Sequence, residues 1–485
     1  MQFLKVMEKP SLQLIKHTVI YGISDVLNRI LAFILIPIYT RFLTTSEYGI
    51  LQIFVICANV GLTIVQLGIS SAIFKSVLYH DNSDKEEILN TAFYFIVISS
   101  ITLLTPMIFI AKQISQWIFA SSQYVVYFKL IVITIFFRSF SIIPLAKLRI
   151  ENSSLKFSVL ISSNFIIQLL MNIFFVIILK KGMIGILISE CIVAGLFAII
   201  YTFSLINILA IRFSFRELNE LLGFGMPLVP AALAMFVLTM SDRFFLKHFS
   251  SLEDVGLYSI GYRFGMIIGI IVTAFQKAWP SVMFTIAKKK NAINIYKTNF
   301  TNFLLILFTA CLGLSLFGKN ILMLLTTPEY ISGYRIIPFI SLSFLCYGIY
   351  FYTAIGMNLK KKTIYQPVIV GMAAVLNLIL NWLLIPRWNI IGASLSTFIS
   401  FCIMALLANI ISLHFYYIPY QYKKISLIIA VYLMTLTPSL LISFDKISVE
   451  IIFKFLLFAF YFILLGIFGF FNKFLLNIRD LKRMI

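Results

Sequence analysis

The clearest indication of the fold class is residues 183–211, which read MIGILISECIVAGLFAIIYTFSLINILAI. A helix needs about 20 apolar residues to cross a bilayer, and this stretch exceeds that length with one charged side chain, Glu190. Over all 485 residues, 61% are apolar and 12% are charged, whereas a soluble domain is about half apolar and about a quarter charged. The sequence therefore predicts an all-α polytopic membrane protein.

Apolar runs separated by charged or turn-rich segments predict about fourteen transmembrane helices. The loops between them are short, and the longest polar stretch is residues 79–87. No room remains for a soluble catalytic domain, so we expect a protein that is not an enzyme. The predicted spans are 14–40, 48–74, 88–111, 124–146, 155–179, 183–211, 222–246, 255–285, 298–318, 333–357, 364–386, 390–415, 425–444 and 451–472.

The distribution of the 39 basic residues predicts the orientation in the membrane. On these spans, 23 of them fall at the amino terminus and on the loops of the same side, and nine fall on the opposite side. Lys and Arg accumulate on the cytoplasmic side of membrane proteins, so both termini are predicted to be cytoplasmic. The net charge of +21 is scattered between apolar runs rather than gathered on one soluble face, so we expect no nucleic acid partner.

The remaining seven basic residues lie within or at the edges of the predicted spans. Charged side chains in the membrane are costly and usually face protein or a water-filled cavity. Only three acids, Asp25, Glu190 and Asp242, are predicted to lie within spans, so a cavity lined by these groups would be cationic. The seven basic residues are Arg29, Lys129, Arg138, Arg243, Arg263, Lys277 and Arg335.

An internal repeat divides the chain. Four pairs of similar stretches are separated by 203 to 207 residues, and a nearly constant offset is the signature of duplicated structure. The matched positions include Gly22 with Gly225, Gly49 with Gly256, Tyr124 with Tyr330, and Gly185 with Gly392.

The offset contains six predicted helices, so the two copies are parallel repeats, a plan in which transporters place the substrate between two moving halves. The predicted domains are residues 1–211 and 212–420, each a six-helix bundle, followed by residues 421–485, two appended helices and a cytoplasmic tail.

Two motif groups carry a family resemblance. The first runs through Arg29, Pro37, Thr40-Arg41-Phe-Leu and Glu47-Tyr-Gly49, and the second through Phe224-Gly225-Met-Pro227, Asp242-Arg243-Phe and Val255-Gly256-Leu-Tyr258. With these motifs, the chain resembles polysaccharide flippases of the multidrug/oligosaccharidyl-lipid/polysaccharide exporter superfamily, with a MATE-like fold. It is most similar to bacterial O-antigen and capsule repeat-unit flippases.

The resemblance implies two six-helix bundles that form a V around a central cationic cavity. It implies that polyprenyl-pyrophosphate-linked oligosaccharide moves from the inner to the outer leaflet of the bacterial inner membrane by alternating access. The expected partners are this lipid-linked oligosaccharide, membrane lipid and other polysaccharide-assembly membrane proteins. The appended helices are similar to those of lipid II flippases, so a lipid II-type flippase is one alternative, and a MATE-type multidrug or cation antiporter is another.

Three arginines are the predicted binding groups for the substrate phosphates: Arg29, Arg138 and Arg263. A planar guanidinium fork suits a phosphate better than an ammonium does. Asp25, one turn before Arg29, could instead neutralise it in a local ion pair. Arg138 and Arg263 have no acid one turn away, so each needs a distant acid, water or an anionic ligand.

A second group of residues is predicted to line the cavity or a gate. Asp25 and Asn28 share a helix face with Arg29. Asp242 and Arg243 lie at the predicted outer end of their span, as a gate contact or as a simple charge pair at a helix end. For the last two, Lys129 and Arg335, the alternative is a side chain that reaches up to the membrane interface.

Asp25 and Glu190 are the candidates for ion coupling. A carboxyl group in the membrane could carry H⁺ or Na⁺ during transport, and for Glu190 the alternative is a neutral, hydrogen-bonded acid. We expect no other cofactor. The five cysteines lie singly in apolar runs without metal-ligand spacing, so no metal site is predicted.

Polar side chains recur every four residues on two predicted helices. Asn164, Gln168 and Asn172 form one stripe, and Asn377 and Asn381 form the other. Such stripes join transmembrane helices by hydrogen bonds, and sugar hydroxyls are the alternative partners.

Overall fold

The computed structural model describes residues 33–79, 82–205, 212–442 and 444–470. The chain divides into two compact units, an N-terminal unit of Met1–Phe236 and a C-terminal unit of Val237–Ile485. This division falls inside one helix, α11. The boundary between six-helix halves expected from the sequence, at residues 211 and 212, stays a prediction.

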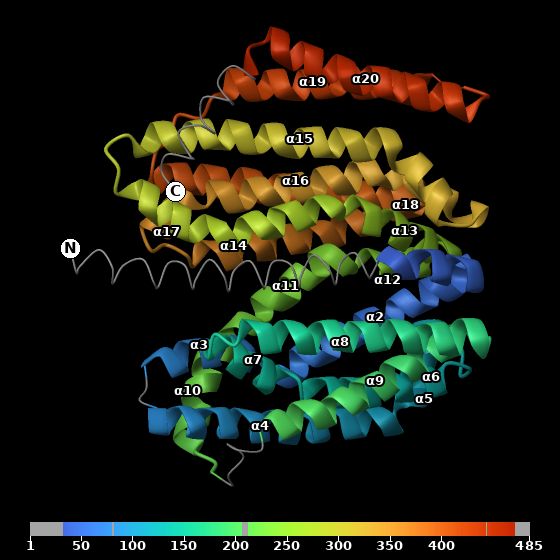
Figure 1. Cartoon of the computed structure of the whole chain (residues 1–485), viewed down its shortest axis with the longest axis vertical. Coiled ribbons are helices and arrows are strands. Elements are labelled where there is room, and N and C mark those ends of the chain that lie inside the picture. Colours follow the sequence, from blue (N-terminus) through green and yellow to red (C-terminus); the bar gives the residue numbers. More distant parts are fainter. Residues whose placement is uncertain (1–32, 80–81, 206–211, 443, 471–485) are drawn as a thin grey trace. The chain divides into compact units, whose positions relative to one another are not determined.

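The N-terminal unit begins, in its described part, with the short apolar helix Phe33–Phe42. The elements that follow are all helical (Figure 1). They are α2 (Thr45–Gln66), α3 (Ile69–Tyr79), α4 (Asn82–Phe109), α5 (Ala111–Phe119), α6 (Val125–Ser139), α7 (Ile142–Ile150), α8 (Ser154–Asn172), the π-helical turn η1 (Ile173–Ile178), α9 (Gly182–Leu205), α10 (Phe215–Gly225), the 3₁₀ turn η2 (Met226–Leu228) and the first part of α11 (Val229–Met240).

The C-terminal unit takes the end of α11 and is also helical throughout its described part. Its last two helices, α19 and α20, form a hairpin (Figure 1). The elements are α12 (Asp242–Phe249), α13 (Leu252–Gly265), α14 (Ile267–Ala287), α15 (Ala292–Leu325), the 3₁₀ segment η3 (Pro328–Ile336), α16 (Ile337–Thr353), α17 (Ile355–Leu359), α18 (Tyr365–Phe415), α19 (Tyr422–Leu441) and α20 (Ile447–Ile467).

The described residues contain 12 helices that are long and apolar enough to cross a membrane. One of them, α18, is interrupted at Asn389, where the backbone leaves helical geometry, and it holds both predicted spans 364–386 and 390–415. The predicted span 14–40 lies largely outside the described residues. The all-α membrane fold expected from the apolar runs is confirmed.

Matching helix caps show the internal repeat at the level of single hydrogen bonds. Thr44 caps α2 by accepting from the Glu47 backbone N–H at 3.2 Å. Ser251 caps α13 by accepting from the Asp254 backbone N–H at 3.1 Å. Each side chain satisfies a donor that the first helical turn leaves unpaired, and the offset is 207 residues for both members of the pair.

The same offset relates the breaks that precede α9 and divide α18. Gly182 and Asn389 both have positive φ, 56° and 46°, a conformation that glycine adopts readily and asparagine tolerates. Three residues later, a Cβ on Gly392 would lie 2.3 Å from the Leu384 carbonyl oxygen, and one on Gly185 would lie 3.1 Å from the Phe175 carbonyl oxygen of η1. The repeated glycines are thus required by close passage of the backbone after each break.

The appended hairpin of α19 and α20 packs on α15 through polar contacts within an apolar surface. The Lys454 ammonium donates to Glu450 at 2.6 Å and to Asn320 of α15 at 2.7 Å. The hydroxyls of Tyr432 and Ser315 lie 3.3 Å apart. Lys454 and Glu450 are largely buried, so their mutual neutralisation permits both charges to sit against α15.

A glycine substitution tests the close packing of α10 on the turn between α2 and α3. A Cβ on Gly225 would lie 2.8 Å from the Gly68 carbonyl carbon and 2.9 Å from the Leu67 carbonyl oxygen. Because both neighbours are backbone, we expect Gly225→Ala to cost about 1–3 kcal/mol, measured as a lower melting temperature of the detergent-purified protein. Gly223→Ala on the same helix is the control, since nothing lies within 4 Å of its Cβ. Equal melting temperatures for the two variants would contradict this packing.

Candidate functional site: a polar pocket in the N-terminal unit

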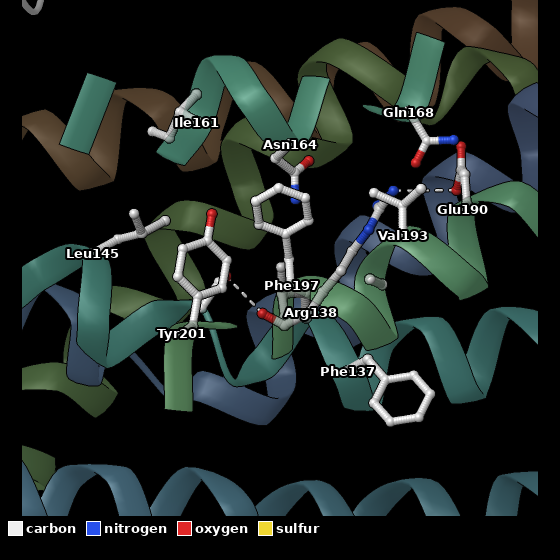
Figure 2. Close-up of a pocket in the computed structure, with 13 residues that line it drawn as sticks. Phe137, Arg138, Leu145, Ile161, Asn164, Gln168, Glu190, Val193, Phe197 and Tyr201 are labelled. Carbon is white, nitrogen blue, oxygen red and sulfur yellow. Dashed lines mark hydrogen bonds and ion pairs between the residues drawn. The ribbon is translucent and has the colours of Figure 1, made fainter. Parts of the chain in front are cut away.

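A pocket of about 280 Å³ lies inside the N-terminal unit, between α6, α8 and α9. Figure 2 shows Arg138 extending toward Glu190 at one end of the pocket and Tyr201 at the other end, with Asn164 and Phe197 between them. Apolar side chains complete the wall. The pocket therefore places a guanidinium, a carboxylate, an amide and a phenol together within an apolar bundle.

An ion pair between α6 and α9 defines the charge of this pocket. The Arg138 Nη2 donates to Glu190 Oε2 at 3.2 Å. The side chains remain 38% and 19% exposed, so the pair is open to a ligand. The acid that Arg138 lacks along its own helix comes from 52 residues further along the chain. The sequence predicted separate roles for these residues, phosphate binding and ion coupling, and the structure brings them together.

One face of α9 supplies much of the pocket wall. Glu190, Val193, Phe197 and Tyr201 line the pocket, and their spacing of three or four residues places them on one side of the helix. Phe197 and Tyr201 are not among the site residues predicted from the sequence. The signal that could have identified them is this helical spacing from Glu190.

A hydrogen-bonded network lies beside the pocket and uses the polar stripe of α8. Gln168 Nε2 donates to Ser189 Oγ of α9 at 3.0 Å. Asn172 Nδ2 donates to the Tyr39 hydroxyl at 2.9 Å, and Asn172 Oδ1 accepts from Ser189. Gln168 and Asn172 therefore join helices, as one reading of the stripe predicted. Gln168 also lines the pocket, as does Asn164 at the other end of the stripe.

The second polar stripe joins helices within the C-terminal unit. Ser241 Oγ donates to Asn377 Oδ1 at 3.2 Å, and Asn381 Nδ2 donates to the same Asn377 oxygen at 3.0 Å. Asn377 and Asn381 are both buried. The interhelical reading of this stripe is confirmed.

Asp242 and Arg243 form a closed cluster, in contrast to the open pair of Arg138 and Glu190. The Arg243 guanidinium donates to Asp242 and to the Thr239 carbonyl, both at 2.7 Å. Its Cζ lies 4.2 Å from the ring centroid of Tyr262 and 4.9 Å from that of Tyr258, whose hydroxyl donates to Asp242. Asp242 and Arg243 are 1% and 4% exposed. The pair lies at the start of α12, where the sequence predicts a helix end, but it is buried rather than at a surface.

The other candidate residues are not gathered at the pocket by the structure. Arg263 lies half-buried on α13 of the C-terminal unit, where it has interactions of its own. Lys129 near the start of α6 and Arg335 near the end of η3 are exposed. Asp25, Asn28 and Arg29 lie outside the described residues. Their predicted roles stay predictions.

Among the described residues, no group of three or more His, Cys, Asp or Glu side chains could hold a metal ion. Their cysteines are free thiols.

The long apolar helices of the described residues define a multi-pass membrane protein. Solved structures share this fold. The inward closed conformation of the lipid II flippase MurJ has a TM-score of 0.74 at 17% identity and covers 91% of this chain and 98% of that chain. An inward-facing multidrug resistance MATE family transporter has a TM-score of 0.66 at 13% identity and covers 79% of this chain and 93% of that chain.

The particular family follows from the sequence itself. Residues 38–335, more than half of the chain, match the family of polysaccharide biosynthesis proteins, and the chain belongs to this family. A relative, the Lsg locus putative protein 1 of Haemophilus influenzae, is 24% identical over 307 residues, which is 61% of this chain and 72% of the relative. The predicted resemblance to MATE-like polysaccharide flippases is confirmed.

Two carboxylate substitutions test the distinction between the closed and the open ion pair. Asp242→Asn leaves the Arg243 charge buried without its partner, and breaking such a pair costs about 3–5 kcal/mol. Glu190→Gln leaves Arg138 beside an open pocket, where water can solvate the guanidinium, so we expect a smaller loss than for the enclosed pair. We expect a large fall in melting temperature for the first variant and a small one for the second. The reverse order would contradict the assignment of Asp242 as structural.

Proposed function

We propose that this protein is a flippase for polyprenyl-pyrophosphate-linked oligosaccharide repeat units of O-antigen, capsule or exopolysaccharide. It moves them from the inner to the outer leaflet of the bacterial cytoplasmic membrane by alternating access through a cationic central cavity. Both termini are cytoplasmic in this proposal, and the activity is transport rather than catalysis. The partners are the lipid-linked oligosaccharide, membrane lipid and other membrane proteins of polysaccharide assembly.

The observation that carries the proposal is the open Arg138–Glu190 pair in a polar pocket. At 3.2 Å, Glu190 engages one terminal nitrogen of the guanidinium, and the other N–H groups of the planar fork can meet phosphate oxygens. Without substrate, Glu190 neutralises Arg138, which lowers the cost of holding a charge in the membrane. When the pyrophosphate arrives, it takes the place of Glu190 as the counterion.

The rest of the pocket suits part of a glycan. Asn164, Ser141 and Tyr201 offer amide and hydroxyl groups along the wall, and these are the groups that hydrogen-bond sugar hydroxyls. A volume of about 280 Å³ is at the lower limit of small-molecule sites. The pocket therefore holds the phosphates and the nearest sugar, while the lipid tail stays in the bilayer.

Ion coupling follows from the same exchange of partners. Once phosphate engages Arg138, the Glu190 carboxylate loses its cation, and a proton or Na⁺ compensates its charge. Release of that ion restores the pair of Arg138 and Glu190 after the substrate leaves. In this proposal Glu190 is the coupling residue, and Asp25 remains a second candidate.

A lipid II-type flippase is the second candidate function. The structural match to MurJ covers 91% of this chain and 98% of the MurJ chain, whereas the match to the inward-facing MATE transporter covers 79% of this chain. The family match to polysaccharide biosynthesis proteins favours the repeat-unit flippase. Expression in a strain lacking its repeat-unit flippase, and separately in one depleted of its lipid II flippase, distinguishes the two. A cation antiporter is the weaker alternative, since the Arg138 guanidinium would repel a cationic drug.

Substitution of Arg138 tests the proposed phosphate contact. We expect Arg138→Ala to lower surface polysaccharide at least about tenfold in a complemented flippase-deficient strain, since a hydrogen bond to a charged group contributes about 1.5–3 kcal/mol. Arg138→Lys should restore part of the export, because an ammonium keeps the charge without the fork.

Lys156→Ala is the matched control, because Lys156 lies on α8, a helix that also lines the pocket, and is exposed outside the pocket wall. Membrane abundance of each variant is measured by immunoblot. Normal surface glycan in Arg138→Ala would exclude the phosphate-binding role of this residue.

A further inference from the structure

Eight lysines gather on the loops at one end of the C-terminal unit. They lie between α14 and α15, between α17 and α18, and at the start of α19, and Figure 1 shows these segments at the same end of the unit. Seven of them are exposed and the eighth, Lys424, is half-buried. We call this set the lysine surface; its members are Lys288, Lys289, Lys290, Lys360, Lys361, Lys362, Lys423 and Lys424.

Tyrosine side chains connect the helix ends that carry the lysine surface, through two hydrogen bonds and one ring contact. The Tyr296 hydroxyl at the start of α15 donates to the Met283 carbonyl near the end of α14 at 2.7 Å. The Tyr352 hydroxyl near the end of α16 donates to the Tyr296 carbonyl at 2.7 Å. The ring of Tyr296 also lies 6.3 Å from that of Tyr416, just after α18. The lysines are therefore carried on connected helix ends rather than on independent loops.

Acidic side chains are absent from this end of the unit in its described part. The six acids of residues 237–442 and 444–470 all lie in α12, in α13, in η3 or next to the start of α20. These elements lie toward the opposite ends of α14, α15, α16 and α19. The six acids are Asp242, Glu253, Asp254, Glu329, Asp445 and Glu450.

The corresponding end of the N-terminal unit has a mixed charge. Lys147 lies 3.6 Å from Glu151 after α7, and Arg216 lies 3.8 Å from Glu220 on α10. Orientation in the membrane depends on Lys and Arg, and acids contribute little to it. The N-terminal unit thus has acidic side chains among its basic ones at this end. The need to orient the protein in the membrane therefore does not explain why the lysine surface has no acidic side chains.

We propose that the lysine surface binds the anionic headgroups of phospholipids in the leaflet it faces. Clusters of four to eight basic residues beside transmembrane helices attract anionic lipid. All eight residues are lysine, a flexible point charge, whereas recognition of one phosphate in a fixed geometry favours arginine. Three exposed tyrosines, Tyr365, Tyr417 and Tyr422, stand beside the cluster, and tyrosine is enriched at the level of the headgroups.

The test measures lipid binding by the purified full-length protein. Native mass spectrometry counts phosphatidylglycerol and phosphatidylcholine retained on the wild type and on a variant with six substitutions, K288Q, K289Q, K290Q, K360Q, K361Q and K362Q. We expect the wild type to prefer phosphatidylglycerol and the variant to lose about tenfold or more of that affinity. Two triple variants, K288Q/K289Q/K290Q and K360Q/K361Q/K362Q, should each lose part of the affinity for phosphatidylglycerol. They replace the six-residue variant in the test if that variant does not fold.

A matched control removes six charges from the N-terminal unit with K75Q, K85Q, K147Q, R149Q, K156Q and R216Q. We expect this variant to keep the preference for phosphatidylglycerol. An equal loss in both variants would show a general effect of net charge and would overturn the proposal. Inorganic pyrophosphate is tested at matched ionic strength, and if it binds as well as phosphatidylglycerol through the same lysines, the surface is a free-phosphate site and the proposal is wrong. These measurements need no transport, so their outcome is independent of the flippase proposal.

Discussion

A charge held inside the membrane needs a counter-charge, and this constraint governs both units of the protein. In the N-terminal unit, Arg138 is compensated by Glu190 across two helices, and the pair stays open to a pocket. In the C-terminal unit, Arg243 is compensated by the adjacent Asp242 and enclosed by tyrosine rings. An open pair can exchange its partner for a ligand, whereas an enclosed pair serves stability.

The two copies of the repeat have diverged at the positions that make the pocket. Arg138 corresponds to Phe344 at an offset of 206, and Glu190 corresponds to Thr397 at an offset of 207. Thr397 donates to the buried Asp242 at 3.4 Å rather than facing a cation. The shared helical plan therefore supports an open ion pair in one unit and a closed polar core in the other.

Much of the fold could be predicted from the sequence, because apolar run length and charge breaks set the spans directly. The break between the spans 364–386 and 390–415 is one example, and the structure has it at Asn389. The ion pair between Arg138 and Glu190 could not be predicted, since these residues are 52 positions apart in the sequence and meet only when α6 packs on α9. The burial of single side chains was also beyond the sequence: Trp279 lies near the end of the predicted span 255–285, yet it is 6% exposed and its ring lies 4.4 Å from that of Tyr352.

In the proposed transport cycle, the pocket beside Arg138 and Glu190 holds the substrate headgroup. Site-specific photocrosslinking in cells tests it most directly, with the crosslinking residue placed on α8 either at Ile161, which lines the pocket, or at Val159, which is 56% exposed on the apolar exterior. We expect a glycan-bearing adduct at position 161 that is several times more abundant than at position 159. Equal labelling at the two positions, or labelling at position 159 alone, would contradict it.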